Sequence, residues 1–338
     1  MENSVFFKNL NLTKIVSHKT LNVIALTGFR SVILINSQMR ELSRYLDANV
    51  EERFCCCEFM DVEDVDKNAC GNFKFINLLV LAGESGIIKI IDIKTGKLIS
   101  ILKGHTGRIN CIKTVDDFIF SCSEDSSIRV WNIKNGKCIG LLAGILGHKD
   151  SINSIDILYN KEKLVSAGTD YTIKQWSIKE ILNPINKDKF IEYVGFPLNN
   201  FQNIHKKPIT KIEYYGNLIV SLSNNEITVI YNNSIDMNAI DNGLKGEFGE
   251  SLNELLIGKI NMYENCKTFK IVNHTLIGIS ETGDIYLFDL RDISRESTPL
   301  IVKSNIKGCT DFIIVENELF STNGNKIEKI SLDLSILF

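Results

Sequence analysis

Histidine, serine and aspartate, the three residue types of a nucleophilic triad, recur twice in this chain at nearly the same spacing, each time followed by a tryptophan. Such a triad would make acyl transfer the first chemistry to consider. The two sets are His105, Ser121, Asp125 and Trp131, and His148, Ser166, Asp170 and Trp176. The interval from histidine to tryptophan is 26 residues in one set and 28 in the other, and 43 residues separate the two histidines.

Repetition at this period indicates structure rather than catalysis. The period lies within the range of about 40 to 45 residues for a four-stranded propeller blade, and the Gly104-His105 and Gly147-His148 pairs complete a pattern that resembles the WD40 signature. Histidine, serine, aspartate and the indole N–H can form one buried chain of hydrogen bonds, which satisfies polar groups that are costly to bury. We therefore predict that all eight residues form structural tetrads, with no catalytic residue among them.

Other chemistries leave no pattern in the sequence. We find no Walker A loop, GxGxxG turn, HExxH helix, GxSxG elbow or zinc-type spacing of cysteine and histidine. None of the nine cysteines lies in a CxxC pair, and most fall in apolar runs, where a free thiol behaves as a small hydrophobe. We predict a protein that is not an enzyme and that has neither a metal site nor a cofactor.

The overall composition excludes two further classes of function. The formal net charge is −3 and lysine and arginine are scattered, so no direct contact with nucleic acid is expected. The N-terminus lacks a basic region followed by an apolar stretch, and no run approaches 18 apolar residues. The sequence therefore predicts neither secretion nor a membrane span.

The elements that would position the tetrads repeat along the whole chain. A short β-branched run, a turn and a second such run recur at residues 22–36, 78–92, 120–132, 165–177, 218–231, 275–289 and 318–331. Seven blades need roughly 300 residues, which fits a chain of 338. We predict an all-β fold, a seven-bladed WD40 β-propeller that forms a single domain over residues 1–338.

The chain ends shortly after the third strand of the seventh blade. We therefore expect an N-terminal strand at about residues 5–12 to pair into that blade and close the ring, since closure removes exposed sheet edges. Three stretches do not fit the blade pattern and are predicted to be loops or insertions. They lie at about residues 61–75, 179–207 and 234–253.

Two blocks of sequence go beyond the general repeat. The first comprises Ala82–Ile91 (AGESGIIKII), Ala143–Asp150 (AGILGHKD) and Trp176-Ser-Ile178, and the second comprises Gly195-Phe-Pro197, Asn203-Ile-His205 and Gly216–Ser221 (GNLIVS). Together they resemble the EED family, the extra-sex-combs-type WD40 subunit of Polycomb repressive complex 2. The resemblance covers the chain from about residue 15 onward and is thinnest in the last two blades.

This resemblance implies a non-catalytic scaffold in the nucleus. In the EED family one face of the propeller holds a helical segment of the SET-domain lysine methyltransferase of Enhancer of zeste type, and other Polycomb subunits join the complex. The other face carries an aromatic cage for trimethylated lysine 27 of the histone H3 tail. Such a cage works because the negative faces of aromatic rings attract a poorly hydrated methylated ammonium.

Most of the aromatic residues of the family's cage are not present at the corresponding positions of this sequence. The family's cage positions fall on Asn11, Cys55, Thr268 and Phe269, of which only Phe269 has an aromatic ring. One ring cannot cage a quaternary ammonium. Either other aromatics replace the missing walls, or mark reading is weakened or lost, and we expect the latter. The aromatics available for replacement are Phe6, Phe7, Phe29, Phe54 and Tyr263.

A different scaffold role remains open. The segment Phe288-Asp-Leu-Arg291 resembles the WDxR box by which WD40 substrate receptors dock onto cullin-RING ubiquitin ligase adaptors. An Asp-x-Arg at the end of a third strand also arises from the chemistry of the repeat itself. The alternatives to the Polycomb subunit are the ligase receptor and another protein-interaction scaffold.

Overall fold

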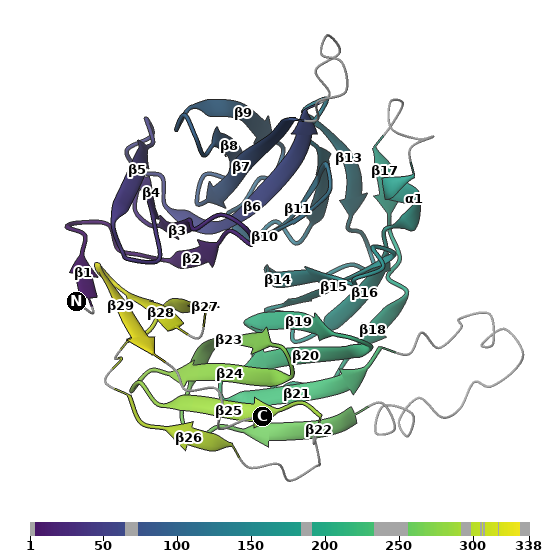
Figure 1. The fold of residues 1–338 in the computed structure, drawn as a ribbon. Helices are drawn as coiled ribbons and strands as arrows, with labels where there is room; N and C mark the ends of the chain where they lie inside the picture. The colour runs from purple at the N-terminus through teal and green to yellow at the C-terminus, as the bar shows by residue number, and fades with distance from the viewer. Residues whose placement is uncertain are drawn as a thin grey trace, which may run out of the picture. The chain divides into compact units, whose positions relative to one another are not determined.

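The computed structural model describes residues 4–64, 74–183, 191–232, 256–291, 299–304, 306, 308–316 and 318–331. Within these residues β-strands dominate, and the one helix, α1 (Lys179–Leu182), has four residues. The strands form seven sheets, which are the blades of a seven-bladed β-propeller (Figure 1). The predicted fold class is therefore confirmed.

The chain divides into two compact units, of which the first comprises Met1–Gly140 and Thr310–Leu332. It contains blades one, two, three and seven. Its strands are β1 (Ser4–Phe6), β2 (Lys14–Ser17), β3 (Ile24–Thr27), β4 (Ser31–Ile35), β5 (Glu41–Leu46), β6 (Phe54–Asp64), β7 (Lys74–Gly83), β8 (Ile87–Asp92), β9 (Leu98–Lys103), β10 (Ile109–Val115), β11 (Phe118–Ser123), β12 (Ile128–Asn132), β27 (Asp311–Val315), β28 (Glu318–Asn323) and β29 (Lys326–Ser331), with β13 (Lys137–Leu142) at the division.

The second unit comprises Leu141–Cys309 and Asp333–Phe338 and contains blades four, five and six. Its strands are β14 (Ile152–Ile157), β15 (Lys163–Gly168), β16 (Ile173–Ser177), β17 (Glu192–Val194), β18 (Asn199–Phe201), β19 (Lys211–Tyr215), β20 (Leu218–Ser223), β21 (Glu226–Tyr231), β22 (Leu256–Asn261), β23 (Cys266–Val272), β24 (Thr275–Ser280), β25 (Ile285–Asp289) and β26 (Leu300–Val302).

The second strand of a blade lies in the interior and the fourth lies at the surface. All six residues of β11 and all six of β24 are buried, because both faces of these strands are covered. Such strands read as continuous apolar runs rather than as an alternation. The outer strand β5 (ELSRYL) has no buried residue, and it alternates polar residues with exposed or half-buried apolar ones. This gradient explains why the inner strands were the parts of each repeat that the sequence predicted most clearly.

The N-terminal segment pairs into blade seven over a shorter stretch than the expected residues 5–12. Strand β1 pairs with β29 in antiparallel register, with Val5 opposite Ile327. Beyond it the backbone takes left-handed angles, with φ of 59° at Asn9 and 45° at Asn11, which end an extended strand. The segment is held instead by the side chain of Asn325, whose Oδ1 accepts hydrogen bonds from the amides of Leu10 (2.9 Å) and Asn11 (2.7 Å).

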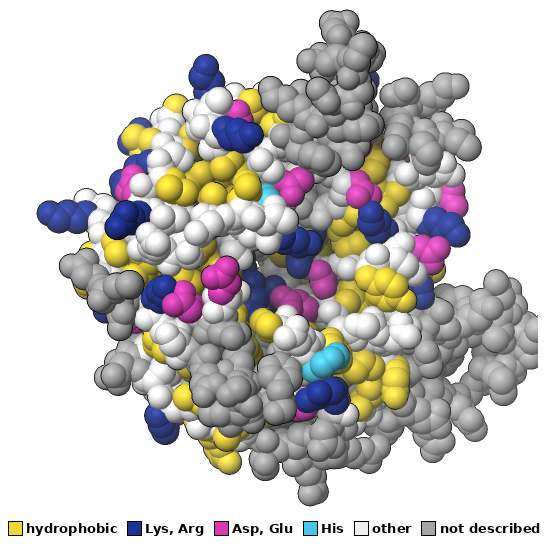
Figure 2. Space-filling model, viewed as in Figure 1, with side chains coloured by type: hydrophobic (Ala, Val, Ile, Leu, Met, Phe, Trp, Pro, Cys, Tyr) yellow, Lys and Arg dark blue, Asp and Glu magenta, His cyan; other side chains and the backbone are white. Residues whose placement is uncertain are grey.

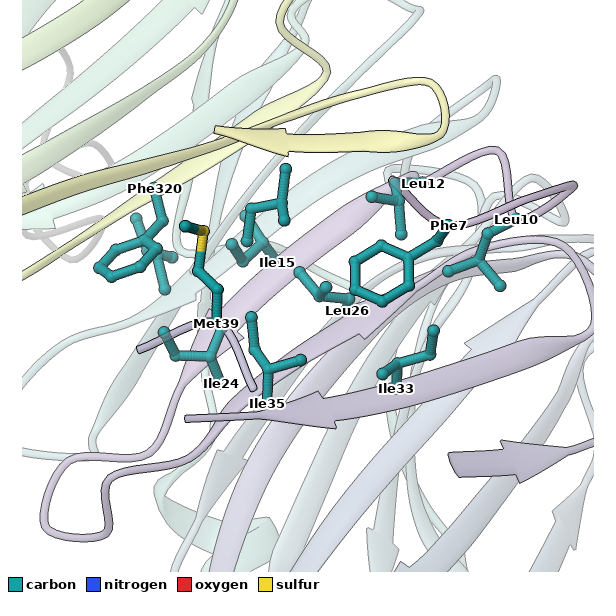
Figure 3. Packing of buried hydrophobic residues seen from close by; sticks show 12 residues of the cluster. Phe7, Leu10, Leu12, Ile15, Ile24, Leu26, Ile33, Ile35, Met39 and Phe320 are labelled. Atoms are coloured by element: carbon teal, nitrogen blue, oxygen red, sulfur yellow. The ribbon is translucent and has the colours of Figure 1, made fainter. Parts of the chain in front are cut away.

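Apolar side chains complete this attachment within the first unit. Figure 3 shows Phe7, Leu10 and Leu12 beside the strands of blade one, in a buried cluster that also contains Leu26 and Phe320. Phe320 belongs to β28 of blade seven. The beginning and the end of the described chain therefore share one core.

Two of the three predicted insertions need correction. Residues 61–64 extend β6, where Asp61 faces Asn77 of β7 and accepts a hydrogen bond from its amide at 2.7 Å. Within 179–207, β18 is the fourth strand of blade four, with buried Phe201 opposite Ile173. These strands were missed because their polar residues interrupt the apolar pattern. The third insertion, at about residues 234–253, lies entirely outside the described residues.

Candidate functional site

The structure brings the four tetrad residues of blade three together. His105 lies on the loop before β10, with Nδ1 2.7 Å from Asp125 Oδ2 and Nε2 2.8 Å from Ser121 Oγ. The indole N–H of Trp131 donates to the same Ser121 oxygen at 2.9 Å. Burial acts to raise the pKa of Asp125, but hydrogen bonds from His105 and Ser127 outweigh it and lower that pKa. Asp125 is therefore an ionised acceptor at neutral pH.

Blade four repeats this arrangement almost atom for atom. His148 Nδ1 lies 2.9 Å from Asp170 Oδ2, His148 Nε2 lies 2.7 Å from Ser166 Oγ, and Trp176 donates to Ser166 at 2.8 Å. Burial lowers the pKa of His148 against the opposing effect of Asp170, so the ring is neutral at pH 7. A neutral ring that donates from Nδ1 to a carboxylate must accept at Nε2, so the Ser166 hydroxyl is the donor there.

These hydrogen-bond chains have the connectivity of a catalytic triad but not its accessibility. Ser121 and Ser166 have no solvent exposure, and each serine oxygen already accepts the proton of a tryptophan. A nucleophile must reach its substrate, which neither serine can do. The geometry therefore supports a structural role for both sets.

A third set of this kind, in blade five, was missed in the sequence. His205 lies within the stretch expected to be an insertion, and its Nε2 is 2.8 Å from Ser221 Oγ and 2.9 Å from Thr228 Oγ1. Its Nδ1 lies 3.2 Å from Glu226 Oε1. Hydrogen bonding from His205 is the largest cause that lowers the pKa of Glu226. Thr228 thus replaces the indole donor, and Glu226 replaces the aspartate.

The signal for this third set was weak for identifiable reasons. Ile204 precedes the histidine where the repeat has glycine, and Ile230 occupies the register position of the tryptophan, opposite Ile219. The glycine is needed in blade three because a Cβ on Gly104 would lie 2.9 Å from the ring of Trp131. Blade five has no tryptophan at this position, so a side chain is allowed before the histidine. The glycine and the tryptophan of the WD40 signature are therefore both missing from blade five.

Two of the predicted cage positions, Thr268 and Phe269, are buried in the second unit. Phe269 is fully buried in the core of the second unit, among residues that include Leu276 and Tyr286, so its ring faces no solvent. Thr268 is also buried, next to a register irregularity of β23. The ring of Phe269, which follows the register irregularity of β23, thus packs in the core of the second unit and offers no face to solvent.

The other two cage positions lie in the first unit. Asn11 is exposed and Cys55 is partly buried. The Cys55 thiol donates to the carbonyl oxygen of Arg53 at 3.3 Å, and burial raises its pKa to about 11. Neither side chain has an aromatic face to offer a cation.

Three of the five possible replacement aromatics are exposed, and two of these already face a cation of the chain itself. The guanidinium of Arg53 lies 5.8 Å from the ring centre of Phe29, and the ammonium of Lys326 lies 5.4 Å from that of Phe6. Tyr263 is 76% exposed, whereas Phe7 and Phe54 are buried. The exposed rings of the first unit are thus partly occupied by internal cation–π contacts.

A buried ion cluster in blade two was not anticipated. Lys89 Nζ lies 2.6 Å from Asp47 Oδ2 and 3.3 Å from Glu52 Oε2, and all three side chains are at most 9% exposed. Ser85 donates a further hydrogen bond to Glu52, and Tyr45 donates to Asp47 at 3.1 Å. Asp47 and Glu52 lie in the loop between β5 and β6, so no repeat pattern marks them.

The described surface adds two observations. On the face shown in Figure 2, lysine and arginine side chains alternate with aspartate and glutamate, without a continuous basic stretch among the described residues. No helix in the described part of the chain has the length and apolar character needed to span a bilayer.

Comparison with known proteins shows that the blades and their tetrads are similar to those of WD-repeat proteins. The WD domain, G-beta repeat family matches residues 96–132 and 136–177, which contain the first two tetrads. In structure, the chain is similar to one in a humanized mutant of the Chaetomium thermophilum Polycomb Repressive Complex 2, with a TM-score of 0.68 and 20% identity over 85% of this chain and 71% of that one. The fold and the tetrads together define a WD40 β-propeller.

Within the WD40 proteins, sequence comparison shows which relatives the chain is similar to. The chain is 31% identical over 208 residues to the Polycomb group protein FIE1 of Oryza sativa subsp. japonica, 33% identical over 210 residues to FIE2 of Zea mays, and 30% identical over 162 residues to the Polycomb protein esc of Drosophila melanogaster. These matches cover 57%, 58% and 43% of this chain, and 42%, 53% and 38% of the relatives. The predicted resemblance to the EED and extra-sex-combs proteins is therefore confirmed, over about half the length of those relatives.

Proposed function

We propose that this chain is a non-catalytic WD40 scaffold of a Polycomb-type complex that methylates lysine 27 of histone H3 in the nucleus. Its role is to hold a helical segment of the SET-domain methyltransferase subunit and to join it to other Polycomb subunits. The sequence similarity to the FIE and esc proteins carries the proposal. The buried serines of the tetrads, Ser121, Ser166 and Ser221, support a scaffold rather than an enzyme.

The proposal is tested by identifying the proteins that co-purify with the tagged full chain. We expect a SET-domain methyltransferase whose activity on histone H3 falls when the chain is depleted. Recovery of a cullin-RING adaptor without a methyltransferase would contradict the proposal and favour the alternative.

Arg291 provides a variant that separates the two roles. Its guanidinium pairs with Asp289 of the same segment at 2.6 Å, and Arg291 is half exposed. In a ligase receptor the Arg291→Ala variant would lose its adaptor. In a Polycomb subunit we expect the same variant to retain the methyltransferase fully, because an exposed ion pair of this kind contributes little to stability.

The second part of the proposal is that trimethyl-lysine reading is weakened or lost. Asn11, Cys55 and Thr268 supply no ring, and Phe269 is buried in the core. Losing two or three rings at about 1 kcal/mol each would weaken binding of the trimethylated lysine by one to two orders of magnitude.

Calorimetry with trimethylated and unmethylated histone H3 peptides tests this second part. We expect the two dissociation constants to differ by less than about tenfold. A larger preference for the trimethylated peptide would contradict the expectation, and loss of that preference in Phe29→Ala or Tyr263→Ala would then identify a rebuilt cage. Phe269→Leu, which preserves most of the core volume, is the control for the buried position.

A further inference from the structure

Blade five carries a cavity of about 230 Å³ that the tetrads do not explain. Its lining comes from the loop before β19, the turn between β20 and β21, and strand β22. The lining residues are Lys206, Lys207, Ser223, Asn225, Glu226 and Lys259. Three lysines and a single glutamate give the cavity an excess of positive charge.

One of the three ammonium groups is fixed in the wall. Lys259 Nζ donates to Glu226 Oε1 and to the carbonyl oxygen of Ile204, each at 3.1 Å. Glu226 also lies 3.2 Å from His205 Nδ1. The Glu226 carboxylate thus contacts both Lys259 and His205. It holds Lys259 in place but does not balance the positive charge of Lys206 and Lys207.

The other two ammonium groups are not neutralised in this way. Lys206 and Lys207 are exposed, and no salt bridge joins either ammonium group to another described residue. Their loop is tied to the adjacent turn, because Ser223 Oγ donates to the carbonyl oxygen of Lys207 at 3.0 Å. Asn225 is held from the other side by a hydrogen bond from its amide to the carbonyl oxygen of Met262 at 3.1 Å.

We propose that this cavity binds a dianionic phosphate group through Lys206, Lys207 and Lys259. A phosphate offers acceptor oxygens in several directions, which suits three lysines that line one cavity from a loop and a strand. A carboxylate carries half the charge and fewer acceptor sites. The volume admits a phosphate together with several waters, each of which takes about 30 Å³. This site is independent of the proposed Polycomb role, because neither a histone nor a methyltransferase takes part in phosphate binding.

The test is a ³¹P NMR line-width titration of the full chain with inorganic phosphate and, separately, with phosphoserine capped at both ends. We expect saturable binding whose dissociation constant rises about tenfold or more in the Lys206→Gln/Lys207→Gln variant. The matched control is Lys97→Gln/Lys103→Gln, which removes the same charge from exposed positions of blade two. It should bind within about twofold of the parent.

Three results would overturn the proposal: no saturable binding to the parent chain, equal weakening in both double variants, or competition by acetate as strong as that by sulfate. Unchanged melting temperatures establish that the variants are folded. The ranking of the two probes identifies the source of the phosphate. Tighter binding of capped phosphoserine indicates a phosphorylated side chain, whereas tighter binding of inorganic phosphate indicates a free anion, and either ranking supports the site.

Discussion

Blades two and three share the order of their first four strands but stabilise their interiors with opposite chemistry. In blade three Ser121 pairs with Arg129 across the two inner strands, and Ile119 pairs with Trp131. The same register in blade two pairs Leu81 with Lys89, and Leu79 with Ile91. Leucine and isoleucine thus replace the serine and the tryptophan of the tetrad.

The consequence is a difference in where buried polar groups find their partners. The blade three tetrad is self-contained, because His105, Asp125 and Trp131 all belong to one blade and its entry loop. In blade two, Lys89 reaches Asp47 and Glu52 in the loop that follows blade one. Blade two, which has no tetrad, therefore depends on the loop that follows its neighbour for the partners of its buried lysine.

The largest effect is expected for Trp131→Ala. The substitution removes a buried ring and leaves Ser121 without its donor, so unfolding should become easier by about 3–5 kcal/mol in denaturant titrations. Trp131→Phe keeps most of the ring volume and should cost clearly less. A Trp131→Ala variant that melts within a degree or two of the parent would show that the tetrad does not stabilise blade three.

Lys89→Met should come next, at about 3 kcal/mol, because it leaves two buried carboxylates without their cation. The triple variant Lys89→Met/Asp47→Asn/Glu52→Gln removes all the charges together and should recover much of that loss. If the single and triple variants were equally unstable, packing of the lysine stem rather than ion pairing would explain the cluster.

Acid should weaken the tetrads before it weakens the ion cluster. The pKa of His148 is lowered by burial, so its stabilising effect is complete above the unfolded value of about 6.5 and is lost as pH falls below it. Burial raises the pKa of Asp47, but hydrogen bonding from Lys89 lowers it overall, so the contribution of Asp47 is lost only below about pH 4. Urea titrations at pH 7.5 and 5.5 should therefore show destabilisation in the parent that is reduced in His148→Gln. If the free energy of unfolding fell by the same amount between pH 7.5 and 5.5 in both proteins, His148 would not be the group whose protonation destabilises the fold.

The smallest effect is expected for an exposed ion pair. Arg44 and Glu41 of β5 pair at 2.9 Å, but both are more than 40% exposed. Arg44→Gln should change the free energy of unfolding by less than about 1 kcal/mol, and added salt should reduce the difference further. This variant is the reference against which the buried cluster around Lys89 is measured, and a loss as large as that of Lys89→Met would remove the distinction between them.

Much of the fold was open to prediction because the blade is a local unit. In blade three, about 30 residues contain the loop that carries His105, strands β11 and β12 and the turn between them. The pattern of the blade can therefore be recognised in one continuous stretch of sequence. The N-terminal strand was expected in blade seven, but the left-handed residues Asn9 and Asn11 end it after Phe6. The spacing of apolar residues does not show that the strand ends at this point.

Sequence by itself determined the seven repeats, the two complete tetrads and the absence of a catalytic signature, because each depends on residues at short and regular separations. Only the tertiary structure decided the partners that lie outside the repeat. It placed Thr228 opposite Ser221, brought Asp47 and Glu52 to Lys89, and turned Phe269 into the core beside an irregular stretch of β23. Register, loop path and strand irregularity set these contacts, and none of the three has a period that can be read along the chain.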